Sequence, residues 1–149
     1  MATVRELSTD ECMRLLTSGV FGRAAVTSPS GPHIVPVNYS VVKDRIVFRT
    51  TPYSVLGSYG RNALMAFEVD HVDYEYGTGW SVVARGRADA ITDPHELDVI
   101  TSTWSPRPWA AGARNLYFGL RWSELTGRRL GFEIDPRRDL PVDRRLAGL

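Results

Sequence analysis

The residues from Arg49 to Ser54 have side chains that could hold a phosphate group. Arg49 and Thr50 end a run of alternating apolar residues, and Ser54 stands directly before a short helical stretch, Val55 to Tyr59. Guanidinium and hydroxyl groups bind phosphate oxygens by strong hydrogen bonds, and a helix N-terminus favours the same negative charge. The pattern Thr-x-Pro-x-Ser is also common in ordinary turns, so the spacing alone leaves a phosphate site and a simple turn as alternatives.

Three further features of the sequence suit a flat ligand. Pro36 has no backbone N–H, so the strand that contains it is open on one side, and Asn38 adds an amide close by. Trp80, which is followed by Ser81, and Trp109 supply flat aromatic surface, although a hydrophobic core would use tryptophan in the same way. Together with the phosphate-type residues, these features predict a flat, phosphorylated ligand that lies across strands.

Two helices and a series of strands are predicted to position these groups. Ser8 and Glu11 form a capping box for a first helix, and Gly19 is a natural left-handed residue at its end. Asp93 and Pro94 are suited to the N-cap and first position of a second helix. The period-two alternation of strands recurs in six or seven segments, at residues 21–27, 34–42, 46–50, 62–70, 80–91, 116–122 and 130–134.

The strand predicted at residues 80–91 indicates a narrow barrel. Small residues allow strands to approach closely inside such a barrel, and closure of the barrel removes exposed strand edges. Residues 71–79 are polar and rich in tyrosine, which is typical of a loop. We therefore expect a mainly β fold with a few short helices, in which the strands form a small antiparallel barrel. The small face of the strand consists of Val82, Ala84, Gly86, Ala88 and Ala90.

The composition is typical of one folded domain. The chain has 149 residues, of which 43% are hydrophobic and 23% charged, so it can form one substantial core. We expect a single domain over residues 1–149, with residues 136–149 as a loose C-terminal tail. The 18 basic residues, of which only Lys43 is lysine, nearly balance the 17 acidic ones, for a net charge of +1. This balance argues against a nucleic-acid partner, including one bound by an oligonucleotide-binding barrel.

Several classes of site and location are disfavoured by single residue types. Cys12 is the only cysteine, which excludes an internal disulfide, and we expect it to be a buried apolar group and not a nucleophile. His33, His71 and His95 are too far apart to suggest a metal site. No apolar run approaches the roughly 20 residues that span a bilayer, and the first residues have no apolar signal region. A cytoplasmic protein without a membrane partner is the expectation.

A series of short motifs occurs in an order that identifies a resemblance. The motifs are residues 7–16, Gly22-Arg23, Val35–Tyr39, Phe48–Thr50, Phe67–Asp70, Gly79–Val83, Arg85-Gly86, Pro108-Trp109 and Thr126–Arg129. With its motifs in this order, the chain resembles the FMN-binding split-barrel proteins that are similar to pyridoxamine 5′-phosphate oxidase. It is most similar to the short actinobacterial-type members. The resemblance implies a split, Greek-key-like antiparallel β-barrel with flanking helices.

The resemblance also implies where a cofactor binds. Such proteins are homodimers with two FMN sites at the interface between the subunits. By this resemblance, the flavin ring lies along Val35, Pro36, Val37, Asn38 and Tyr39, and the flavin phosphate lies at Arg49, Thr50 and Ser54, next to Val55. The second subunit contributes its Trp80 and Ser81, and its Trp109 and Arg114 from a loop of variable length.

One position departs from the pattern of the family. Relatives usually carry lysine or arginine directly after the serine, where this chain has Val55. The neutral side chain removes one hydrogen bond to a charged group, a contact worth about 1.5–3 kcal/mol. That free energy corresponds to about one to two decades in affinity. Weaker FMN binding is therefore one expectation, and a deazaflavin coenzyme or heme, which other branches use, are the alternatives.

The implied function is that of an FMN-binding oxidoreductase, which transfers a hydride or electrons to a small molecule. No acid–base pair or nucleophile in the sequence has to be catalytic, so the catalytic residues are unassigned. Asn38, Ser81 and backbone amides are candidates for hydrogen bonds to the edge of the flavin ring. The alternative is a non-catalytic carrier or redox sensor that binds flavin, deazaflavin or heme on the same fold. The substrate and the electron donor stay open.

Overall fold

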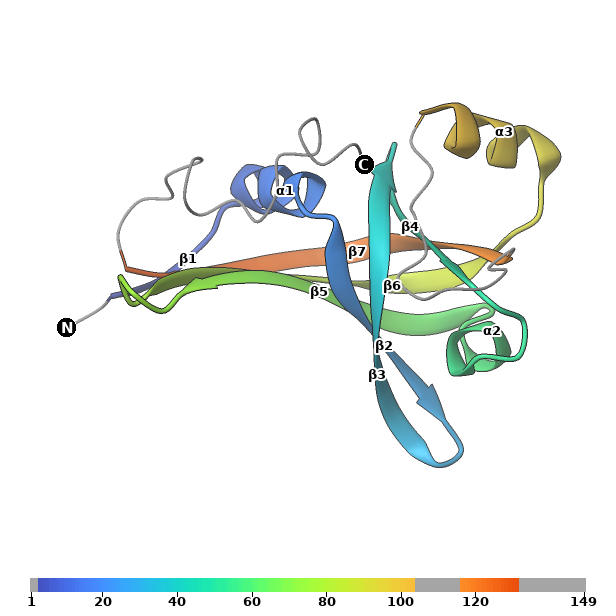
Figure 1. Ribbon diagram of the computed structural model, residues 1–149, viewed down its shortest axis with the longest axis horizontal. Helices are drawn as coiled ribbons and strands as arrows, with labels where there is room; N and C mark the ends of the chain where they lie inside the picture. Colours follow the sequence, from blue (N-terminus) through green and yellow to red (C-terminus); the bar gives the residue numbers. More distant parts are fainter. Residues whose placement is uncertain (1–2, 104–115, 132–149) are drawn as a thin grey trace.

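The computed structural model describes residues 3–103 and 116–131, which form a mainly β fold (Figure 1). The described helices are α1 (Thr9–Ser18), α2 (Val55–Tyr59) and α3 (Pro94–Thr103). The described strands are β1 (Val4–Glu6), β2 (Phe21–Ser28), β3 (Gly31–Val42), β4 (Arg45–Thr50), β5 (Ala63–Asp73), β6 (Thr78–Ile91) and β7 (Leu116–Leu130).

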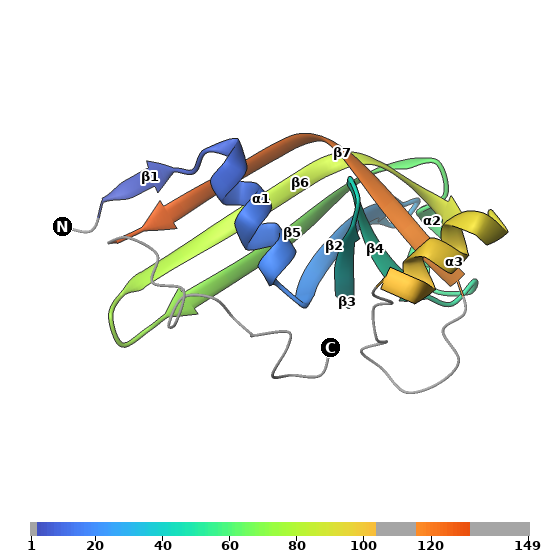
Figure 2. The same ribbon diagram turned by 90° about the horizontal axis from the view of Figure 1, so that it is seen from above.

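The strands form one antiparallel sheet that closes on itself. The strand order is β1-β7-β4-β3-β2-β5-β6, and an additional pairing of β6 with β7 closes the ring, so that β1 extends outside it (Figure 2). Strands β2, β3 and β4 follow one another as hairpins, and β5 then returns to pair with β2. This arrangement is a Greek key, and the expected antiparallel barrel is confirmed.

The barrel is split because β3 changes partners along its length. Residues Gly31–Asn38 pair with β2, whereas Tyr39–Val42 pair with β4. Figure 1 shows the β2–β3 hairpin projecting away from the barrel while β4 turns toward α2. Within the described ranges, one edge of β3 therefore has no strand partner from Gly31 to Asn38, as the proline at position 36 predicts.

Alternating side chains fill two hydrophobic clusters. The main core lies inside the barrel and contains the fully buried rings of Tyr39, Phe48, Phe67 and Phe118. Helix α1 packs its buried Cys12, Leu15 and Leu16 onto this core, and the Tyr39 hydroxyl donates a hydrogen bond to the Leu16 carbonyl (2.5 Å). A second cluster lies beneath α3 and consists of Val42, Val47, Ile91 and Ile100.

The small-residue face of β6 points into the barrel, as predicted. Val82, Ala84, Gly86 and Ala88 are all buried. A methyl group on Gly86 would collide with the backbone carbonyl of Arg121 on β7, at the place where the register of the two strands shifts. The small residues therefore permit the close approach of the two longest strands.

The prediction of a loop at residues 71–79 is wrong in most of its length. Strand β5 continues to Asp73 and β6 begins at Thr78, because His71 and Trp80 pair directly across the two strands. Only a tight turn remains between them. In this turn Asp73 Oδ1 accepts hydrogen bonds from two backbone N–H groups, and Gly77 adopts a positive φ of 62°.

The prediction that the strand beginning at Leu116 ends at Trp122 is also wrong. Strand β7 runs from Leu116 to Leu130, because pairing with β6 continues through its polar middle. The prediction of a left-handed glycine at position 19 is also wrong, because the φ of Gly19 is −73°. Glycine is required there because a side chain would collide with the Tyr39 hydroxyl. The predicted segment 132–134 and tail 136–149 lie outside the described residues.

Candidate functional site

The two main predicted segments, Val35–Tyr39 and Arg49–Ser54, both adjoin the point at which β3 and β4 separate. The last pair of their ladder joins Tyr39 to Phe48. If the ladder continued, Asn38 would face Arg49 and Val37 would face Thr50, but beyond this point β4 pairs only with β7 among the described strands. The backbone edge of Val35–Asn38 therefore borders the place where β4 ends and leads into α2. Such an edge leaves N–H and C=O groups available to a ligand.

The side chains of the β3 segment alternate between the core and the outer face of the sheet. Val37 and Tyr39 are buried in the barrel, and Val35 packs against the same core. Pro36 is exposed and Asn38 is half-buried on the opposite face. A ligand at this edge would meet the backbone and the Asn38 amide, while the apolar side chains hold the strand in place.

The two hydroxyl groups of the predicted phosphate site are in direct contact. Thr50 Oγ1 lies 2.6 Å from Ser54 Oγ. Ser54 is the N-cap of α2: its hydroxyl accepts a hydrogen bond from the Gly57 N–H (3.0 Å) and donates one to the Thr51 carbonyl (2.8 Å). The Thr50 hydroxyl must then be the donor in the pair. Both hydroxyl hydrogens are used inside the protein, so one must rotate to meet a phosphate.

Arg49 and Val55 determine the charge near these hydroxyls. Alternation along β4 places Arg49 on the opposite face from Thr50, which is 4% exposed. The Arg49 guanidinium carbon lies 5.2 Å from the centre of the Tyr117 ring on β7, a cation–π arrangement. Val55 is half-buried and packs against the main core. Thus Arg49 is the one cationic side chain among the predicted phosphate residues that the structure describes.

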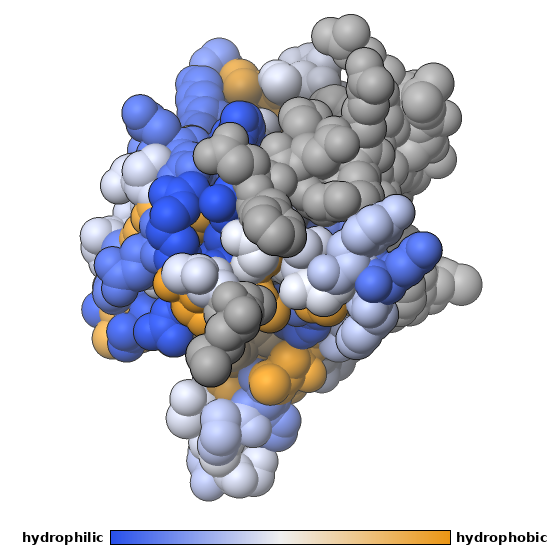
Figure 3. Space-filling view, turned by 90° about the vertical axis from the view of Figure 1, so that its left-hand side faces the viewer, coloured by the Kyte–Doolittle hydropathy of each residue, from blue (hydrophilic) through white to orange (hydrophobic). Residues whose placement is uncertain are grey.

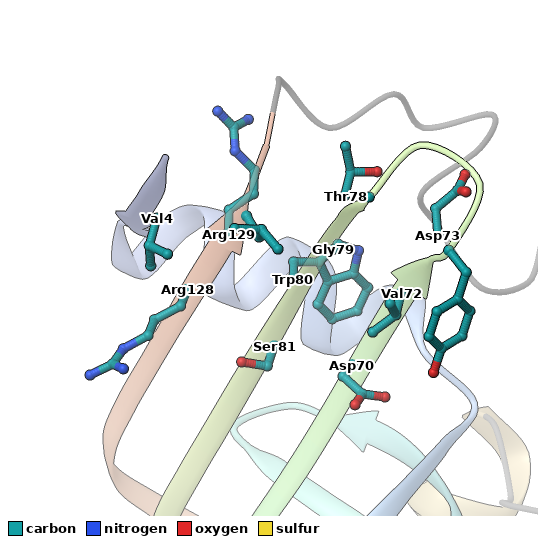
Figure 4. A pocket seen from close by; sticks show the side chains of 13 residues that line it. Val4, Asp70, Val72, Asp73, Thr78, Gly79, Trp80, Ser81, Arg128 and Arg129 are labelled. Atoms are coloured by element: carbon teal, nitrogen blue, oxygen red, sulfur yellow. The ribbon is translucent and has the colours of Figure 1, made fainter. Parts of the chain in front are cut away.

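Trp80 and Ser81 lie apart from this group, toward the other end of β6. Trp80 is 3% exposed and belongs to the main core, so its ring is not a free surface in this chain. Ser81 faces outward and lines a pocket of about 330 Å³ at the ends of β5, β6 and β7 (Figure 4). Figures 1 and 2 both place this end of the sheet far from α2. One chain therefore does not bring Ser81 to the hydroxyl pair.

An ion-pair cluster on the outer face was not predicted from the sequence. Arg23 binds Glu68 (3.1 Å) and Asp70 (2.9 Å), which lie on the neighbouring strand. Burial, followed by repulsion from Asp70, raises the pKa of the Glu68 carboxyl above its ordinary value, while Arg23 acts in the opposite sense. The alternation of residues 21–27 and 62–70 places these side chains on one face, but the pairing of β2 with β5 had to be known to join them.

Arg128 is a second residue that the sequence did not single out as part of a site. It lies opposite Ser81 across β6 and β7, and it lines the same pocket. Its membership of the Thr126–Arg129 motif was the available signal. The predicted residues Trp109 and Arg114 lie outside the described residues.

Three observations on the described ranges concern other kinds of site. No group of three or more His, Cys, Asp or Glu side chains there could hold a metal ion. Cys12 is buried against Leu7 and Gly127, and burial raises the pKa of its thiol, which suits an apolar packing role. None of the helices in residues 3–103 is long and apolar enough to cross a membrane.

Comparison with known proteins gives a consistent family. A family model described as pyridoxamine 5′-phosphate oxidase matches residues 8–129. The uncharacterized protein Rv0080 of Mycobacterium tuberculosis is 35% identical over 132 residues, which cover 85% of this chain and 86% of that protein.

Solved structures resemble the chain over most of its length. The FAD binding protein from Mycobacterium smegmatis is 31% identical, with a TM-score of 0.71, and the match covers 85% of this chain and 98% of that one. A FAD and heme binding protein from the same organism is 16% identical, with a TM-score of 0.64 over 90% of this chain and 78% of that one. The second likeness shows the fold alone.

Proposed function

Because the chain belongs to the pyridoxamine 5′-phosphate oxidase family, we propose that it binds a flavin and acts as a flavin-dependent oxidoreductase on a small molecule. The observation that carries this proposal is the edge of β3 at Val35–Asn38, which has no strand partner within the described residues and begins where the ladder with β4 ends, at the Tyr39–Phe48 pair. A bound flavin would supply the hydride or electron transfer, and the protein would supply binding and orientation.

The residues at this place fit the two parts of a flavin nucleotide. The free backbone groups of Val35–Asn38 and the Asn38 amide suit the polar edge of the ring. The guanidinium of Arg49 and the hydroxyls of Thr50 and Ser54 suit the phosphate. Neutral Val55 leaves the phosphate with a single cation among these residues, so we expect weaker binding than a second cation would give.

FMN is the form of flavin that we propose. The residues proposed to bind the phosphate provide one guanidinium and two hydroxyl groups, a set that suits the single terminal phosphate of FMN. The similar protein of Mycobacterium smegmatis is a FAD binding protein, so FAD is the form to be distinguished by experiment.

The proposed site is completed by a second copy of the chain. Ser81 lies far from the hydroxyl pair within one chain, so it reaches a shared flavin only from a partner subunit. The ring of Trp80 is buried in the core of its own chain, so of this predicted pair only Ser81 presents a side chain outward. We propose Trp109 and Arg114 as further contributions of the partner. The unpaired β3 edge and the 73% exposed Ile34 beside it support an interface there.

A non-catalytic carrier or sensor of flavin, deazaflavin or heme is the second candidate. It is favoured by the chemistry of the described site residues, whose side chains are hydroxyls, amides, apolar groups and one guanidinium. These groups bind a cofactor, but none is an obvious acid or base at neutral pH. Steady turnover of an acceptor with a nicotinamide or reduced deazaflavin donor would identify an enzyme, and stoichiometric binding without turnover would identify a carrier.

The purified protein tests the flavin directly. We expect flavin absorbance at about 450 nm, release of FMN on denaturation with identification by mass, and one FMN per chain on titration. A colourless protein that binds no FMN in the micromolar range would contradict the proposal. Released FAD, deazaflavin or heme would keep a cofactor site but replace FMN.

A further inference from the structure

The backbone groups on the open edge of β3 can be identified one by one. The Tyr39 N–H points toward β2, because it donates a hydrogen bond to the Val20 carbonyl (2.9 Å). In an antiparallel ladder the N–H and C=O of one residue point to the same side, and those of the next residue point to the other side. Alternation from Tyr39 therefore directs residues 32, 34, 36 and 38 at the edge that has no partner among the described strands.

Two of these four residues are prolines. Ile34 and Asn38 each present an N–H and a carbonyl to the open edge, whereas Pro32 and Pro36 present a carbonyl alone. The two N–H donors are thus separated by Pro36. A further strand needs an N–H and a C=O from every second residue, and a proline ring occupies the place of the missing hydrogen. A strand added here would leave carbonyls of its own without donors.

Apart from its prolines, the strand is well suited to pairing with another molecule. The segment Ile34–Val42 contains no charged residue and is rich in β-branched side chains. Ile34 is 73% exposed, and Pro32 and Pro36 are exposed on the same face. Figure 3 shows the hairpin as the projection at the bottom of the molecule, where pale side chains of intermediate hydropathy predominate. An exposed, uncharged strand edge is a typical site of strand addition between copies.

Other devices that protect sheet edges are missing at this place. Proteins commonly block an edge with a charged side chain, a β-bulge or a covering segment. None of the four edge residues is charged, and the register of β2 with β3 runs from Phe21 to Ser28 without a bulge. Within residues 3–103 and 116–131, no strand covers the edge between Gly31 and Asn38. The missing N–H groups of the prolines are the protection that the described residues provide.

We propose that Pro32 and Pro36 determine which partners the open edge of β3 accepts. They exclude an extended strand, above all the same edge of a second copy, and leave the separate donors of Ile34 and Asn38 accessible to a small molecule. This selectivity does not depend on a flavin. One consequence does rest on the proposed function: in the proposed dimer, the second copy meets this edge without extending the sheet.

The test restores the two missing N–H groups in the full chain. The double variant Pro32→Ala/Pro36→Ala should associate beyond the wild-type assembly at a protein concentration about tenfold or more lower, because each strand gains two backbone donors. Sedimentation velocity over a series of concentrations, without added flavin, measures this association. Circular dichroism and thermal denaturation show whether the variant is folded. A folded double variant that has the wild-type mass at every concentration would overturn the proposal.

Two further variants assign the association to this edge. Pro29→Ala is the matched control, because Pro29 is exposed in the turn between β2 and β3 and its new N–H lies outside the strand. It should behave as the wild type. Ile34→Lys, added to the double variant, should reverse the association, since a lysine on an edge opposes strand addition. Equal association of Pro29→Ala, or association that persists with Ile34→Lys, would overturn the proposal.

Hydrogen exchange locates the contact. The amide hydrogens of Ile34 and Asn38 should exchange rapidly in the wild type and become protected when the double variant associates. Protection confined to other strands would overturn the proposal. These measurements need no flavin, so they separate this inference from the proposed function. A wild-type protein that binds no flavin would reject the proposed function only, and a double variant that does not associate would reject the role of the prolines only.

Discussion

Arg49 and Val55 are the residues on which the affinity of the proposed phosphate site depends. Thr50 and Ser54 contribute hydroxyls that already bind each other and the backbone of α2. The net gain from these hydroxyls is therefore small, because a phosphate exchanges existing hydrogen bonds for new ones. The charge of Arg49, and the lack of charge at Val55, should have the larger effects.

Arg49→Ala should weaken FMN binding about tenfold to a hundredfold through loss of a hydrogen bond to a charged group. Riboflavin, which has no phosphate, should bind equally to both proteins. The measurement is fluorescence titration of each flavin. Arg87→Ala is the control, since Arg87 is exposed on β6 and bonds to Asn62 (2.9 Å). Equal FMN affinity of the wild type and Arg49→Ala would remove Arg49 from the site.

Val55→Lys should tighten FMN binding, by about tenfold, because it restores a cation next to Ser54. Val55 is half-buried, so the lysine stem can lie along the apolar surface while its ammonium group reaches water. Val55→Met is the matched control, since it adds length without charge. A gain in FMN affinity with lysine alone, and none for riboflavin, identifies the phosphate as the cause; equal effects of the two substitutions would refute it.

At the scale of elements, α1 is the clearest case of local stabilisation. Ser8 and Glu11 form the capping box that the sequence predicts, with hydrogen bonds of 2.8 and 3.2 Å. Arg5 on β1 binds Glu11 at 2.7 Å and so connects the helix start to the sheet. The Arg5 hydrogen bond, followed by the Ser8 backbone N–H, lowers the pKa of Glu11 from 4.5 to about 2.

The lowered pKa of Glu11 predicts a pH dependence of stability. The carboxylate stabilises the folded state fully above its unfolded pKa of 4.5, and this contribution is lost as the pH falls toward about 2. Glu11→Gln should therefore lower the melting temperature at pH 6 and have little effect near pH 2, which thermal denaturation across this range would measure. Asp10→Asn, a change at the neighbouring exposed carboxylate, is the matched control for the loss of one negative charge in the first turn. A constant difference between wild type and Glu11→Gln at every pH would contradict the role of charge.

At the scale of the whole molecule, the outer face of the sheet is the surface that we propose to bind a second copy. This face contains the Arg23–Glu68–Asp70 cluster, the unpaired edge of β3 and half-buried Val83 on β6. The register places Val83 between Glu68 and Thr126, near the centre of the face. A large charged side chain there should therefore disrupt a dimer without entering the core.

Val83→Arg should convert the proposed dimer to a monomer and at the same time remove flavin binding, because each site would lose its second subunit. Analytical ultracentrifugation and flavin absorbance of the same sample measure the two effects. Thr101→Arg is the control, since Thr101 is exposed on α3. A monomer that retains full flavin affinity would show that the site needs one chain only, and an unchanged dimer would place the interface elsewhere.

The sequence by itself determined the local features of this protein. The capping residues Ser8, Ser54 and Asp93 predict all three described helices, because a cap acts on backbone groups within three residues of it. Alternation of apolar residues likewise predicts which face of β6 is buried, because a strand between a core and water has a period of two.

Only the tertiary structure decided how distant segments meet. The change of partner in β3 leaves Asn38 and Arg49 next to the last pair of the β3–β4 ladder, Tyr39 and Phe48, and the pairing of β6 with β7 extends the strand expected at residues 116–122 and joins Ser81 to Arg128. Neither follows from local pattern, since any two alternating strands present equivalent backbone groups. The choice among them is made by closure of the barrel around one core, in which small side chains such as Gly86 permit the contact. The sequence therefore predicted the residues of the proposed flavin site, and the fold decided which of them one chain can bring together.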